Sequence, residues 1–203
     1  MDGGMHMSTY HVVRMDKPDW SAVEAVELHH QPWLKDNGVR AYAQACHDGE
    51  RIHVRMEAKE EEIRATLTQP LDAVCTDSCL EFFFAPEAGD DRYFNLEWNP
   101  LGTLYLGFGA ARETRVRMLV RDKDALFAPK PYTVEGGWGI EFSVPVAFIR
   151  LFFPRFFLEG EAAGNFYKCG DKTSVPHYLA WAPLSSARPD YHRRGDFGKL
   201  IFD

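Results

Sequence analysis

Apolar and polar residues alternate along much of the chain, and segment 51–59 shows the pattern most clearly. There Ile52, Val54, Met56 and Ala58 are apolar, and every residue between them is polar. Successive side chains of a β-strand point to opposite faces of its sheet, so this segment is predicted to be a strand with one buried face and one wet face. Weaker alternation predicts further strands near 39–46, 79–85, 93–98, 103–108, 114–120, 138–144, 177–181 and 198–202.

Turn residues separate these segments, at 48–49, 87–91, 99–102 and 135–137. Helical character is confined to 146–153 and to 60–67, and the second of these segments could equally continue as strand. About nine or more short strands joined by hairpin-length turns predict an all-β protein, an antiparallel β-sandwich of jelly-roll type with one or two short helices. Since no repeat or linker divides the chain, we expect an N-terminal tail at 1–10 and a single domain at 11–203.

Charge and composition exclude several classes of partner. Lys and Arg number 23 against 30 Asp and Glu, a net charge of -7, so no long-range positive field favours nucleic acid. Arg150, Pro154 and Arg155 interrupt the most apolar stretch, 147–158, so no membrane span is expected. The first ten residues lack the basic and apolar regions of a secretory signal. This predicts a cytoplasmic protein for the sequence as written, or an extracytoplasmic one if a native leader is missing.

The four cysteines do not form a metal-ligand pattern along the chain. Cys75 and Cys79 are four residues apart, but Cys46 and Cys169 do not provide a second pair at matching spacing. The eight histidines also show no ligand pattern. We therefore expect reduced thiols, several of them buried, and neither a metal nor another cofactor.

Two predicted strands place polar side chains on a common face. If Phe82 and Phe84 face one way, Glu81 faces the other, and Asn95 shares a face with Glu97 on the next strand. A polar face carrying Glu81, Asn95 and Glu97 is therefore one hypothesis. The alternative is an ordinary solvated sheet face.

The C-terminal third gathers aromatic rings, hydrogen-bonding groups and turn residues at 164–171, 176–181 and 189–192. Side chains that contact ligands are often on loops of this kind. A sugar requires both kinds of group, because its C–H faces pack on flat rings and its hydroxyls need hydrogen-bonding partners.

The order of these blocks along the chain resembles the family 9 carbohydrate-binding modules and their bacterial family 9-like relatives. The resemblance runs from 39 to 203 and rests on three blocks: the strand 77–84, the strand 93–99, and the closing Trp181, Asp190-Tyr191 and 197–200. It implies a β-sandwich that binds the ends of glycan chains or oligosaccharides in carbohydrate catabolism, beside or attached to glycoside hydrolases.

The resemblance also implies roles for individual residues. It assigns hydroxyl binding to Glu81, and it places Asn95 where the family has a basic residue. The family clamps its sugar between two tryptophans; one position corresponds to Tyr191, and the other to Cys75, which cannot stack. Trp98 or Trp33 would then supply the second ring. The family's structural calcium sites do not transfer to residues that can be named.

Three functions follow as hypotheses. The first is non-catalytic saccharide binding by Tyr191 and Trp98 as rings, with Glu81, Asn95 and Glu97 as polar partners and His177 and His192 flanking the site. The second is a small glycoside hydrolase that uses Glu81 and Glu97, since hydrolysis requires a pair of carboxylates. A nucleophile made of Cys169 and His177 is disfavoured, because no oxyanion-loop motif surrounds that cysteine. The third is a structural or partner-binding sandwich whose sugar site has decayed.

Overall fold

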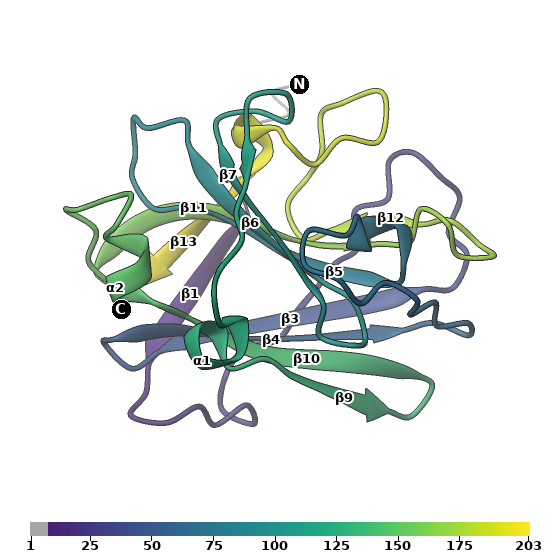
Figure 1. Cartoon of the computed structure of the whole chain (residues 1–203), viewed down its shortest axis with the longest axis horizontal. Helices are drawn as coiled ribbons and strands as arrows, with labels where there is room; N and C mark the ends of the chain where they lie inside the picture. The colour runs from purple at the N-terminus through teal and green to yellow at the C-terminus, as the bar shows by residue number, and fades with distance from the viewer. Residues whose placement is uncertain (1–7) are drawn as a thin grey trace, which may run out of the picture.

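Thirteen strands form one continuous curled sheet in the computed structural model, which describes residues 8–203 (Figure 1). The strands are β1 (Thr9–Arg14), β2 (Val26–Glu27), β3 (Arg40–His47), β4 (Arg51–Lys59), β5 (Cys79–Ala85), β6 (Tyr93–Trp98), β7 (Leu104–Gly109), β8 (Val116–Arg117), β9 (Lys130–Val134), β10 (Gly137–Pro145), β11 (Gly160–Cys169), β12 (Tyr178–Ala180) and β13 (Gly198–Phe202). Short helices are α1 (Lys123–Phe127) and α2 (Val146–Ile149), with 3₁₀ turns at Val74–Thr76 and Arg194–Asp196. None of the helices within the described residues has the length and hydropathy needed to cross a membrane.

Strand β1 joins the two halves of this sheet. Its residues 9–12 pair in parallel with β13, and its residues 13–14 pair in parallel with β3. The other pairings are antiparallel, in the order β8-β7-β6-β5-β11-β13-β1-β3-β4-β10-β9. The all-β prediction is confirmed, but the expectation of a purely antiparallel sheet is wrong, because the first strand runs between two strands parallel to it. Thr9 and Tyr10, expected in the tail, are part of β1, and residues 1–7 lie outside the described residues.

The main core lies inside the curl. Alternation in β4 is confirmed, since Ile52, Val54, Met56 and Ala58 are buried while their neighbours reach solvent. These side chains belong to the same apolar cluster as Phe82 and the other inward residues of β5, β6 and β10. Removing this apolar surface from water is the main stabilising contribution to the fold.

Several elements differ from the sequence-based expectation. Segment 60–67 is neither helix nor strand, and strand 114–120 shrinks to the two residues of β8. The ten-residue β11 was missed, because both of its faces are covered and no alternation marks it. Helix α1 was also missed; Asp122 caps it by accepting a hydrogen bond from the Ala125 N–H.

A second cluster covers the outer face of β5, β6, β7 and β11. Its rings are those of Phe83, Tyr93, Tyr105, Tyr167, Tyr191 and Phe197, with the thiols of Cys79 and Cys169 beside them. The C-terminal loops pack against this face, and Tyr191 and Phe197 come from them. The outer face therefore combines rings and polar groups beneath a layer of loops.

Candidate functional site

A cleft of about 290 Å³ opens on this outer face. We call it the site cleft. Its floor is formed by Glu81 of β5, Glu97 of β6 and Cys169 of β11, and its walls by residues of the surrounding loops and of strands β7, β8 and β12. These wall residues are Trp33, Ala73, Cys75, Tyr105, Arg112, Arg115, Arg117, Asp171, Tyr178, Pro189, Asp190, Tyr191 and His192.

The floor of the site cleft holds two carboxylates side by side. Glu81 and Glu97 are directly opposite each other in the β5–β6 register, and they are only 2% and 4% exposed. The Cys169 thiol donates to Glu81 Oε1 at 2.9 Å, and Asn95 Nδ2 donates to Glu97 Oε1 at 2.7 Å. Each carboxylate thus has a hydrogen-bonding partner that fixes its orientation.

Burial changes the proton affinity of both groups. It raises the pKa of Glu97 to about 7, with Arg115 acting in the opposite direction. Burial and the neighbouring Glu97 charge also raise the pKa of Glu81 well above its ordinary value. Near neutral pH the pair therefore holds a proton, and it offers both a donor and acceptors to a ligand.

One wall of the site cleft is aromatic. The Tyr191 ring stacks on Tyr167 with centroids 4.0 Å apart and an interplanar angle of 11°, and its hydroxyl lies 3.0 Å from the Lys168 carbonyl oxygen. Tyr191 is only 7% exposed, so it is not the open stacking platform expected from the sequence. Trp33 is more accessible. Its centroid lies 5.6 Å from that of Tyr191, and its Nε1 donates to the Ser186 carbonyl oxygen at 2.7 Å.

Another part of the lining is charged. Arg112 Nε lies 3.4 Å from Asp190 Oδ1, so these two side chains form an ion pair at the rim. Arg115 and Arg117 both lie over the Tyr105 ring, 5.6 Å from its centroid. The site cleft therefore has guanidinium groups facing its acidic floor.

The structure brings together four of the seven residues predicted for the site, namely Glu81, Glu97, Tyr191 and His192. Asn95 is fully buried and lies behind Glu97, not on the cleft surface. Asn95 therefore does not bind a sugar hydroxyl directly, as was predicted, but orients the Glu97 carboxylate.

Trp98 is a correction to the sequence-based site. It follows Glu97 in the same strand, so its side chain points to the opposite face, into the core. There it is fully buried against Phe127 and Phe142. It cannot stack on a ligand in the site cleft.

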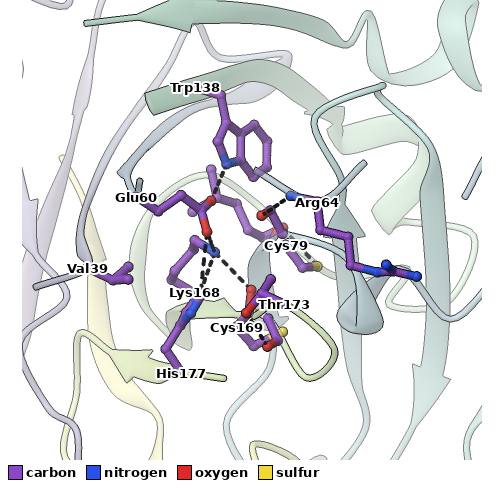
Figure 2. A network of polar contacts seen from close by, with 12 residues as sticks. Val39, Glu60, Arg64, Cys79, Trp138, Lys168, Cys169, Thr173 and His177 are labelled. Atoms are coloured by element: carbon purple, nitrogen blue, oxygen red, sulfur yellow. Dashed lines mark hydrogen bonds and ion pairs between the residues drawn. The ribbon is translucent and has the colours of Figure 1, made fainter. Parts of the chain in front are cut away.

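His177 is a second correction. Its Nε2 lies 2.6 Å from Lys168 Nζ, and Glu60 binds the same ammonium group at 3.1 Å (Figure 2). Lys168 neighbours Cys169 in β11 and points to the other face, and His177 packs against it there. The ring is thus outside the site cleft, and the Cys169 thiol bonds to Glu81 instead of forming a dyad with His177.

The arginines of the site cleft were not singled out from the sequence. All three follow β7. The strand predicted at 114–120 includes Arg115 and Arg117, and Arg112 lies before it. Trp33 was named only as a possible second ring. Trp33 is far from the other cleft residues in the sequence, so only the fold shows that it lies beside them.

The chain matches the family model described as carbohydrate-binding family 9 over residues 8–202. A comparison with curated protein sequences gives no significant match.

Solved structures with similar folds cover nearly the whole chain. One, from Bacteroides uniformis, was solved as a candidate carbohydrate-binding protein; it is 28% identical, the alignment covers 97% of this chain and 100% of that one, and the TM-score is 0.83. A family 9 carbohydrate-binding module from Caldicellulosiruptor kristjanssonii, in complex with cellotriose, is 10% identical, with 96% and 93% coverage and a TM-score of 0.66. A second structure, of such a module from the same organism with glucose, is 11% identical, with 96% and 95% coverage and a TM-score of 0.63.

Proposed function

The chain belongs to carbohydrate-binding family 9, and from this premise we propose that the site cleft binds a saccharide without cleaving it. The proposal rests on one observation: Trp33 and Tyr191 line the same cleft as the Glu81–Glu97 pair. Rings and buried carboxylates are the two kinds of group that sugar recognition requires.

The aromatic wall and the acidic floor match the two kinds of surface on a pyranose. The apolar C–H face packs on the accessible ring of Trp33, with Tyr191 closing the same side. The hydroxyls meet Glu81 and Glu97, which together donate and accept because the pair holds a proton near neutral pH. A volume of about 290 Å³ is at the lower end for small-molecule sites, which suits one sugar unit or the end of a chain.

The position of the carboxylates argues against hydrolysis. A glycosidase needs its two carboxylates on either side of the scissile bond. Glu81 and Glu97 instead are directly paired on neighbouring strands and approach a ligand from one side. This arrangement supports binding over catalysis.

The accessible volume argues against a decayed site. A sugar site that had been lost would be filled by its own side chains. Tyr191 does pack inward, yet the space beside it stays open, and Trp33 takes the place of the clamp ring that Cys75 cannot provide.

Isothermal titration with glucose, cellobiose and cellotriose tests the proposal, since glucose and cellotriose are the ligands of the C. kristjanssonii modules. We expect dissociation constants from micromolar to millimolar, and tenfold or greater weakening in Glu97→Gln. Glu161→Gln is the matched control, because Glu161 is exposed on β11 and pairs with Lys199. Failure of every saccharide in a broad glycan array to bind would refute the proposal. Release of a chromogenic aglycone that stops in Glu81→Gln would favour the hydrolase.

A further inference from the structure

Two thiols and a carboxylate meet at the floor of the site cleft. Cys169 of β11 is directly opposite Cys79 of β5, and Glu81 follows two residues later on the same face of β5. One ligand atom from each residue lies within 4.8 Å of the others, and all three residues are buried. The sequence offered no second ligand pair for Cys79; the antiparallel pairing of β5 with β11 supplies Cys169.

We propose that Cys79, Cys169 and Glu81 bind a thiophilic divalent cation, for which zinc is the best match. Zinc accepts thiolate and carboxylate ligands together, in a tetrahedral arrangement. With zinc–sulfur bonds of about 2.3 Å, two sulfur ligands are roughly 3.8 Å apart, so donors already within 4.8 Å need to move by only about 1 Å or less. Harder cations such as calcium prefer oxygen ligands, and the two thiols therefore disfavour them.

The ion would be reached from the site cleft. Cys169 and Glu81 both line it, and Cys75 and Glu97 line it beside them. Three protein ligands leave a fourth position for water or for a group of the bound molecule. Glu81 has two carboxylate oxygens, so binding the ion through one leaves the other for a hydroxyl. The guanidinium of Arg115, which also lines the site cleft, offsets the negative charge of the Glu81 carboxylate.

Cobalt substitution tests this inference without any saccharide. Co²⁺ is added to the reduced, chelator-treated full chain, because thiolate ligation of cobalt gives charge-transfer absorption in the near ultraviolet, with an intensity that follows the number of thiolates. We expect this absorption in the wild type and its displacement by Zn²⁺. Cys169→Ser is expected to lose most of it and to bind zinc more than about tenfold more weakly. Cys46→Ala is the matched control, because Cys46 is buried in β3 and does not belong to the cluster.

The spectrum of the wild type alone can overturn the inference, so the test does not depend on the folding of any variant. Absence of thiolate-to-cobalt absorption in the reduced chain would overturn it, as would full absorption in Cys169→Ser. If Cys79 and Cys169 are found as a disulfide, the chain is reduced before cobalt is added. Failure of the two reduced thiols to bind cobalt would also overturn the inference. Saccharide titration in the presence of chelator is read separately, so that failure of metal binding and failure of the proposed function are distinguishable.

Discussion

Trp33 and Tyr191 lie with ring centroids 5.6 Å apart at one wall of the site cleft, although one comes from the N-terminal part of the chain and the other from the last loop. Tyr191 is held by Tyr167 and by backbone carbonyls, whereas Trp33 stays partly accessible. Of the two rings, Trp33 therefore has more surface to offer a ligand.

Replacement of Trp33 by Ala is expected to weaken saccharide binding about tenfold or more, equivalent to roughly 1.4 kcal/mol, because the ring supplies the flat surface of the cleft. Titration calorimetry measures the loss. Trp20→Ala is the control, since Trp20 is also partly exposed but does not line the site cleft. Equal affinity in wild type and Trp33→Ala would show that the ring does not contact the sugar.

Gly107 on β7 lies opposite Asn95 on β6, and it leaves the space that the asparagine side chain occupies. A Cβ at this glycine would lie 2.2 Å from Asn95 Oδ1, so Gly107→Ala forces Asn95 to move and break its hydrogen bond to Glu97. We expect weaker saccharide binding and about 1–3 kcal/mol lower stability in denaturant unfolding.

Gly195→Ala provides the control for that substitution, because nothing lies within 4 Å of its added Cβ. If both alanine variants bind saccharide as the wild type does, the orientation of Glu97 by Asn95 is unimportant for recognition.

The alternating pattern of β5 and β6 was enough to predict the acidic floor from the sequence. Glu81, Asn95 and Glu97 do share one face, as the period of two requires. The same rule places Trp98 on the core side, so its inclusion in the site neglected a constraint already present in the sequence. Local periodicity thus determines which face a residue occupies.

Long-range pairing accounts for what the sequence left undetermined. The meeting of Cys79 with Cys169 depends on the β5–β11 register, and the position of Trp33 depends on loop packing against β12. Strand β1 was missed as well, because its parallel partners β3 and β13 are distant in sequence. The residues next to each position in the sequence do not predict such long-range contacts. The contacts are seen only in the folded chain.

Lys168 and Glu60 form an ion pair that is almost completely excluded from water, with side chains 0% and 2% exposed. Figure 2 shows the Glu60 carboxylate between Trp138, whose Nε1 donates to it at 2.6 Å, and the Lys168 ammonium. Lys168→Met is expected to cost about 3–5 kcal/mol, because the buried Glu60 carboxylate loses its nearest cation and keeps only His177, with Nε2 at 3.6 Å, as a basic neighbour.

The double variant Lys168→Met, Glu60→Gln should recover a large part of that loss, since it removes both charges together. Chemical unfolding of the wild type, both single variants and the double variant gives the coupling free energy. Additive effects of the two single substitutions would contradict the pairing.

His192 is expected to make the stability of the protein sensitive to acid. Burial and the charges of Arg115 and Arg112 lower the pKa of its imidazole from 6.5 to about 3, and its Nδ1 lies 2.9 Å from the Tyr93 hydroxyl. As the pH falls below 6.5, the unfolded chain binds a proton that the folded chain does not, so stability falls with the pH over this range until the folded pKa is reached. His192→Asn keeps a polar atom near the position of Nδ1 but does not titrate. Between pH 6.5 and about pH 5 we therefore expect the wild type to lose about 1 kcal/mol more stability than this variant. This figure is reduced from the full linkage value because solvent reaches part of the ring. Urea unfolding at a series of pH values measures the difference, and identical pH slopes for the two proteins would show that His192 titrates normally in the fold.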